Sequence, residues 1–158
     1  MSIPKLKKFL KGTKNFMIIM SIDLGEVRTG LAACDKSETL AYPLGTITEK
    51  NKNNLAAKIL EKANEIKAEM IVIGLPKNMD GSLGKSAENS AEFKKLLESQ
   101  TNLPIVSWDE RRTTIAAANY LNETNTRGKK RKSVIDTLSA SIILENFLNY
   151  RKNNFSAT

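Results

Sequence analysis

Residues 17–34 of the chain, MIIMSIDLGEVRTGLAAC, carry the pattern that decides the fold. Two apolar runs, residues 17–22 and 29–34, are separated by a short polar stretch that begins with Asp23-Leu24-Gly25. A short apolar run that ends in turn-forming residues is typical of a buried β-strand. The connection between the two runs is too short for a helix, so we expect two adjacent antiparallel strands.

The rest of the chain first continues this pattern and then changes it. Residues 43–48 are a third candidate strand, which completes an antiparallel meander. After it, Leu55, Ile59 and Ala63 recur at helical spacing. The later expected elements are a helix over residues 55–66, a strand over 70–74, a helix over 87–97, a strand over 104–108, a short helix over 113–121 and a closing helix over 133–150. The sequence therefore predicts an α/β fold with a mixed five-stranded sheet, in which an antiparallel meander of three strands precedes two parallel strands, and with helices on both faces.

Length and composition are those of one globular domain. The chain has 158 residues, of which 41% are apolar, enough for a single core. We expect residues 17–152 to form this domain, residues 1–16 to be a flexible basic extension, and residues 153–158 to be a tail. No apolar stretch is long enough to cross a membrane, no secretory signal is evident, and the single cysteine fits a reducing compartment. These features predict a soluble, cytoplasmic protein.

The residue types that are absent narrow the possible chemistry. The chain has no histidine, which excludes a histidine base, histidine zinc ligands and a Ser-His-Asp triad. A single cysteine excludes a zinc site made of thiolates. Carboxylates without nitrogen or sulfur ligands favour hard cations, so the expected cofactor is Mg²⁺ or Mn²⁺.

The net charge of +8 is distributed unevenly. Residues 1–16 contain five lysines and no acid, and residues 127–132 contain five lysines and arginines and no acid. A basic run is often only a solvated loop. Beside a candidate active site, however, such a run favours contact with a phosphate backbone, so nucleic acid is the expected partner.

Three acids are candidates for an active site at one edge of the predicted sheet. Strands one, four and five are expected to run in the same direction, so the segments that follow them meet at one edge. Asp23 follows the first strand, and Glu110 follows the fifth. Asp136 belongs to the closing helix, although Ser133 and Asp136 also fit a capping box that would begin that helix. Asp109 precedes Glu110 directly, and an irregular strand end could make it the ligand instead.

Three gathered carboxylates fit hydrolysis of a phosphodiester bond assisted by two metal ions. The ions hold and activate water, so the reaction requires no histidine base. Cations in the neighbouring segments are candidates for holding phosphate groups. The candidate nucleic-acid-binding residues are Arg28, Lys85, Arg111, Arg112, Lys129, Lys130, Arg131 and Lys132, and the candidate site-loop residues are Gly25, Asn78, Asp80, Gly81 and Ser82.

Four blocks of the sequence carry a resemblance to a known family. They are residues 22–30 (IDLGEVRTG), 74–82 (GLPKNMDGS), 109–111 (DER) and 132–136 (KSVID). With these blocks, over residues 17–150, the chain resembles the YqgF-type pre-16S rRNA nucleases, which are also described as Holliday-junction-resolvase-like proteins. The resemblance implies an RNase H-like fold and catalytic acids at Asp23, Glu110 and Asp136. It also implies a hydrolase that matures the 5′ end of small-subunit rRNA during ribosome biogenesis.

Three other functions remain open at this point. A DNA resolvase would use the same acids, and such enzymes usually act as symmetric dimers. This sequence shows no obvious long apolar surface helix for a dimer, so we expect a monomer or a weak dimer. A non-catalytic RNA-binding assembly factor would keep the fold, but the presence of all three acids argues against it. A nucleotide-binding fold like that of sugar kinases and actin-like ATPases would need a second domain, for which 158 residues are too few.

Overall fold

A computed structural model describes residues 17–75, 84–109 and 128–155 of the chain, with only the backbone described for residues 128–137 and 154–155. The elements are β1 (Ile19–Asp23), β2 (Arg28–Cys34), β3 (Ala41–Thr48), α2 (Lys52–Glu65), β4 (Met70–Leu75), α3 (Lys85–Glu98), β5 (Ile105–Asp109) and α5 (Gly128–Phe155). The basic extension over residues 1–16 and the short helix expected over 113–121 lie outside the described residues. None of the described helices is long and apolar enough to cross a membrane.

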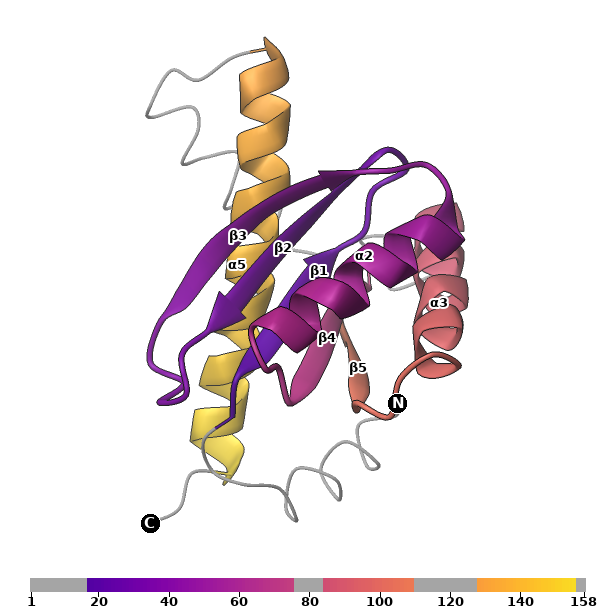
Figure 1. Cartoon of the computed structure of the whole chain (residues 1–158). Coiled ribbons are helices and arrows are strands. Elements are labelled where there is room, and N and C mark those ends of the chain that lie inside the picture. The colour runs from indigo at the N-terminus through magenta and orange to yellow at the C-terminus, as the bar shows by residue number, and fades with distance from the viewer. Residues whose placement is uncertain (1–16, 76–83, 110–127, 156–158) are drawn as a thin grey trace.

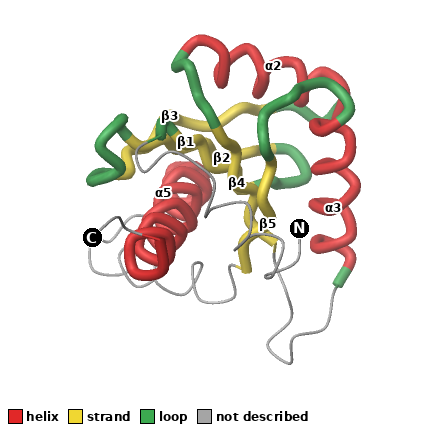
Figure 2. Tube along the Cα trace, turned by 90° about the horizontal axis from the view of Figure 1, so that it is seen from below, coloured by secondary structure: helices red, strands yellow, loops and turns green. Residues whose placement is uncertain are grey.

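The five strands form one sheet in the order β3-β2-β1-β4-β5. β2 is antiparallel to both β1 and β3, whereas β4 is parallel to both β1 and β5. Helix α5 covers one face of this sheet, and α2 and α3 cover the other (Figures 1 and 2). The predicted α/β fold, with its meander and its two parallel strands, is therefore confirmed.

Each face of the sheet has its own apolar core, because side chains alternate between the faces along every strand. Ile19 and Val72 are fully buried on the α5 face, together with Phe147 of the helix. Ile22 and Ile71 are buried on the opposite face, under α2 and α3. Because the faces alternate, these residues determine on which face each remaining residue of β1 and β4 lies.

The closing helix differs from its prediction at both ends. The apolar spacing predicts a helix over residues 133–150, whereas α5 begins at Gly128 and continues to Phe155. The first turns are missed because the basic run contains no apolar residue that could show helical spacing. Ser133 lies inside the helix and is not its N-cap, so the interpretation of Ser133 and Asp136 as a capping box is wrong.

Candidate metal and nucleic-acid site

Asp23 is the last residue of β1, and it lies partly exposed at the carboxyl edge of the sheet. Its position on the strand assigns it to the α5 face. Ile19 packs in the core under α5, and the Oγ of Ser21 donates a 2.6 Å hydrogen bond to the carbonyl oxygen of Ala140 in α5. Since alternate residues of a strand share a face, Asp23 follows these two residues on the α5 side.

On each of the two strands next to β1, the residue beside Asp23 is a glycine. Gly30 of β2 is directly opposite Asp23. In β4 the residue beyond the Ile22–Ile73 pair is Gly74, which comes next to Asp23 by register. A Cβ atom at either glycine would project on the α5 face beside the carboxylate. The two strand neighbours of Asp23 therefore place no side chain beside its carboxylate on this face.

Helix α5 runs antiparallel to β1, as two contacts at different positions along β1 show. We call such a position along the strand its height. Arg151, near the end of the helix, donates from Nε to Oε1 of Glu38 at 2.7 Å. Oε2 of Glu38 accepts the backbone N–H of Met17, which precedes β1, at 3.0 Å. Ala140 lies earlier in the helix and contacts Ser21, which lies later along the strand. The beginning of α5 is therefore near the carboxyl edge of the sheet (Figure 1).

This orientation brings the backbone of Asp136 to the height of Asp23. Two residues along a strand from Ser21 to Asp23 advance about 6.6 Å, and four residues back along a helix from Ala140 to Asp136 advance about 6 Å. Position 136 also shares its helix face with Ala140 and Ile143, both fully buried against the sheet. The side chain of Asp136 lies outside the described part of the chain.

The end of β5 separates the two adjacent acids onto different faces. Trp108 is on the α5 face, where its ring centroid lies 5.5 Å from that of Phe147 and 5.1 Å from that of Tyr150. Strand alternation then directs Asp109, the last residue of β5, to the α3 face. Glu110 lies outside the described residues.

The turn that follows Asp23 is held by two neighbouring elements. Lys52, the first residue of α2, donates from Nζ to the carbonyl oxygen of Gly25 at 3.1 Å. The backbone N–H of Glu49 donates to the carbonyl oxygen of Val27 at 2.8 Å. A Cβ atom on Gly25 would collide with the backbone carbonyl of Arg28, so this position requires glycine. The turn is thus a fixed part of the edge that carries Asp23.

The described candidate cations lie in three different places. Arg28 is the first residue of β2 and shares the α5 face with Gly30. Lys85 is exposed at the start of α3, so it lies at the carboxyl edge but on the opposite face. The basic run at residues 129–132 lies in the first turns of α5, which project beyond the strands (Figure 1). Arg111, Arg112, Asn78, Asp80, Gly81 and Ser82 lie outside the described residues.

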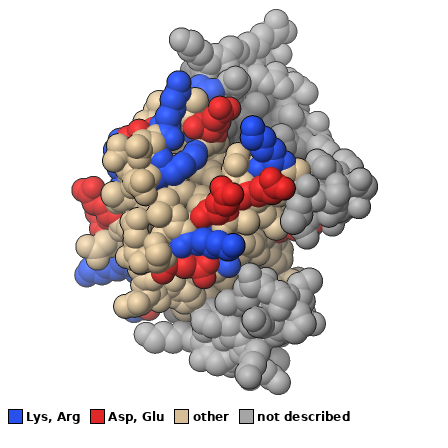
Figure 3. All heavy atoms as spheres, turned by 90° about the vertical axis from the view of Figure 1, so that its right-hand side faces the viewer, with Lys and Arg blue, Asp and Glu red and all other residues tan. Residues whose placement is uncertain are grey.

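The charge distribution is different on the face that carries α3. There, lysine, arginine, aspartate and glutamate side chains are mixed without a patch of one sign (Figure 3). Ion pairs such as Lys94–Glu98, 3.5 Å apart in α3, contribute to this pattern. The described residues of this face therefore form no continuous basic surface for a phosphate backbone.

The described residues fit a hard divalent cation at Asp23. No group of three acidic or cysteine side chains comes together within the described part of the chain, which includes neither Glu110 nor the side chain of Asp136. Asp23 supplies a carboxylate, the kind of oxygen ligand that Mg²⁺ or Mn²⁺ binds, and its glycine neighbours add no side chain beside it. The soft donor Cys34 is buried at the far end of the sheet and takes no part.

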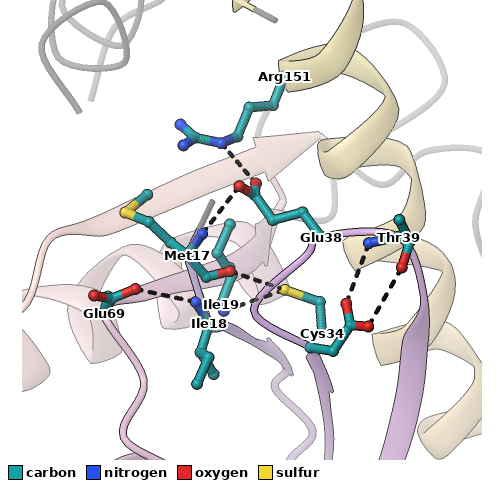
Figure 4. Close-up of polar contacts among 9 residues, drawn as sticks. Met17, Ile18, Ile19, Cys34, Glu38, Thr39, Glu69 and Arg151 are labelled. Atoms are coloured by element: carbon teal, nitrogen blue, oxygen red, sulfur yellow. Dashed lines mark hydrogen bonds and ion pairs between the residues drawn. The ribbon is translucent and has the colours of Figure 1, made fainter. Parts of the chain in front are cut away.

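At that far end, polar groups are paired with one another inside the protein. Glu38 bonds Arg151 and Met17 as described above, and the Sγ of Cys34 donates to the carbonyl of Met17 and accepts the N–H of Ile19, both at 3.3 Å (Figure 4). Burial raises the pKa of the Cys34 thiol to about 11. Burial also raises the pKa of the Glu38 carboxyl, and the neighbouring Arg151 opposes this shift.

Four residues beside the site escape sequence-based prediction of a role: Ser21, Gly30, Lys52 and Gly74. Lys52 alone gives a signal, because a cation in the first turn of a helix opposes the helix dipole and needs a specific reason. Gly30 and Gly74 stand in the motifs of the resemblance, yet only the sheet register makes them neighbours of Asp23. In the sequence, Ser21 is indistinguishable from an ordinary core residue of β1.

The amino-acid sequence is similar to those of known proteins. Residues 17–150 match the family RuvX, described as Holliday junction resolvase. A protein of Halothermothrix orenii named "Putative pre-16S rRNA nuclease" is 40% identical over 135 residues, which are 85% of this chain and 96% of that protein. A protein of the same name from Thermoanaerobacter pseudethanolicus is 40% identical over 138 residues, covering 87% of this chain and 99% of that protein.

Among solved structures, RuvC of T. thermophilus in complex with a Holliday junction substrate has a similar fold. Its TM-score is 0.56 at 14% sequence identity, over 87% of this chain and 96% of that one. RuvC is RNase H-like, so this likeness gives the fold its class. The match over nearly the whole described core and the identity to full-length relatives place this chain in the RuvX (YqgF) family of Holliday-junction-resolvase-like proteins.

Proposed function

We propose that this protein is a divalent-metal-dependent nuclease that hydrolyses phosphodiester bonds in RNA. Its active site is the carboxyl edge of the sheet on the α5 face. Asp23, Glu110 and Asp136 are the metal ligands, with two ions of Mg²⁺ or Mn²⁺ when the substrate is bound.

The observation that carries this proposal is the place of Asp23 at the carboxyl edge of the sheet, on the face that α5 covers. Asp23 lies at the edge between Gly30 and Gly74. Because β1 and α5 run antiparallel, we expect position 136 at the same height as Asp23. Because Trp108 is on the α5 face, alternation along the strand favours the same face for position 110. Glu110 is therefore a better candidate than Asp109, which the same alternation directs to the α3 face.

The chain's own residues bind and orient the substrate in this mechanism. The metal ions, when bound, supply an activated water and stabilise the leaving oxygen. Arg28 shares the face of Asp23 and holds a phosphate group beside it. Lys52 fixes the carbonyl of Gly25 and so keeps the turn after Asp23 in place.

The basic run at residues 129–132 contacts the phosphate backbone outside the active site. Four cations in the first turns of α5 lie near the positive end of the helix dipole, where they are unfavourable without an anion. A phosphate backbone would relieve this repulsion, and its oxygens could accept hydrogen bonds from the backbone N–H groups of the first turn. The run would thereby guide the substrate towards Asp23.

The relatives narrow the proposed substrate. Those from Halothermothrix orenii and Thermoanaerobacter pseudethanolicus are named for pre-16S rRNA, so we assign this chain to 5′-end maturation of precursor rRNA in the cytoplasm. The partner is then precursor rRNA or a pre-ribosomal particle, and the working form is a monomer or a weak dimer. We also assign the domain to residues 17–152, preceded by a basic extension and followed by a short tail.

A DNA resolvase is the second candidate. The description of the RuvX family and the fold shared with RuvC favour it. It would use the same acids on a four-way junction. A non-catalytic RNA-binding assembly factor is the third, since it needs the basic surface but not the acids.

Cleavage by the purified protein with Mg²⁺ or Mn²⁺ separates these candidates. A precursor rRNA 5′ leader and a four-way DNA junction are offered separately, with EDTA and Asp23→Asn as controls. We expect cleavage of the leader that both controls abolish. Cleavage of the junction alone would make the protein a resolvase, and tight RNA binding without cleavage would make it an assembly factor.

A further inference from the structure

A buried hydrogen bond joins β1 to α5 next to the proposed active site. The Oγ of Ser21 donates to the carbonyl oxygen of Ala140 at 2.6 Å, and both residues are fully buried. Ser21 lies two residues before Asp23 and on the same face of β1, and Ala140 follows Asp136 by one helical turn. The bond therefore links the two elements that carry these acids, close to both.

Apolar residues surround this bond. Ala140, Ile143 and Leu144 pack in the core on the α5 face, and their hydrophobic contacts are not directional. A hydrogen bond requires one donor–acceptor distance and direction. The ion pair of Arg151 with Glu38 also fixes a height, but it lies at the amino end of β1, further from the acids.

We infer that Ser21 is a positioning residue for the metal site. Its bond to Ala140 sets the height of α5 along β1 and so holds Asp136 level with Asp23. The inference rests on the proposed function, because it requires that both acids bind the metal. Ser21 itself touches neither metal nor substrate in this role.

Metal binding tests this role without relying on activity. Mn²⁺ affinity is measured by calorimetry on the full chain for the native protein, Ser21→Ala, Asp136→Asn and the double variant. Ser90→Ala is the matched control, since Ser90 is also a buried serine but belongs to α3 on the other face. Loss of a supporting contact in a metal site weakens affinity by about 10-fold or more, which is the effect expected for Ser21→Ala.

The double variant separates positioning from general destabilisation. We expect Ser90→Ala to bind like the native protein, and we expect Ser21→Ala to have no further effect once Asp136 is already Asn. Native affinity in Ser21→Ala would overturn the inference, as would an equal loss in the Asp136→Asn background. If instead the native protein binds no Mn²⁺, or Asp136→Asn binds it unchanged, the proposed function fails and the inference falls with it.

Discussion

The two ends of β1 differ in how they use acidic side chains. At the amino end, the Glu38 side chain is only 9% exposed, and both of its oxygens accept hydrogen bonds from within the protein. At the carboxyl end, Asp23 is partly exposed on an edge where glycines flank it and where Arg28 and the start of α5 bring cations. The backbone of Glu38 has a φ of 55°, which is unfavourable for a non-glycine residue.

This difference separates stability from chemistry along a single strand. A buried acid with internal partners holds together the turn before β3, the start of β1 and the end of α5. An acid at an open edge can bind ions and substrate, since it is not enclosed by the core. Substitutions at the amino end should therefore change the free energy of unfolding, whereas those at the carboxyl edge should change cleavage.

The largest effect on stability is expected for Glu38→Gln. It removes the charge that pairs with the buried guanidinium of Arg151 at 2.7 Å, and breaking a buried ion pair costs about 3–5 kcal/mol of unfolding free energy. Glu49→Gln is the matched control, because it breaks the 3.0 Å Lys58–Glu49 pair at the surface and should cost less than about 1 kcal/mol. Urea denaturation measures both changes. Equal losses would remove the contrast between the two ends.

Neutralising the basic run tests the carboxyl end. Changing Lys129, Lys130, Arg131 and Lys132 to alanine should weaken RNA binding and flatten its dependence on salt. The log–log slope should fall by roughly 0.7 to 0.9 for each lost phosphate contact. Affinity measured at several salt concentrations gives this slope. An unchanged slope would mean that the run is only a solvated helix end.

Two glycine substitutions sharpen the comparison further. Gly30→Ala places a methyl group opposite Asp23 and should lower the cleavage rate about tenfold or more. Stability should be kept, because alanine suits a strand interior better than glycine. Gly45 of β3 has a φ of 110° and open space around it. Gly45→Ala should therefore cost about 1–2 kcal/mol from strain and leave cleavage intact. The reverse pattern would refute the role of Gly30.

A smaller effect concerns pH. Burial already raises the pKa of Glu38 in the folded protein, and Arg151→Met removes the charge that opposes this shift. The folded state of the variant then binds a proton more tightly than the unfolded state does. Its stability should rise as pH falls from 7 through the raised pKa towards the ordinary value of 4.5, more steeply than in the native protein. Parallel stability–pH curves would contradict this.

Sequence patterns were sufficient to predict the sheet but not all of the site. Apolar runs and helical spacing identify every strand and the helices α2 and α3, because these elements bury regular faces. The start of α5 escapes this signal since it buries nothing that the spacing can show. The Glu38–Arg151 pair spans 113 residues of sequence, so no local pattern could reveal it. Likewise, only the register of β1 with β2 and β4 identifies Gly30 and Gly74 as neighbours of Asp23.

The most direct test of the separation between the two ends is single-turnover cleavage of a precursor rRNA leader by Asp23→Asn and Asp136→Asn, with melting of each variant recorded in parallel. Each substitution removes a charge from the proposed site but keeps the size of the side chain. The result expected for both is loss of cleavage by about a thousandfold or more, with a melting temperature close to that of the native protein. Cleavage retained in either variant, or lost only together with the fold, would contradict an active site built from Asp23 and Asp136.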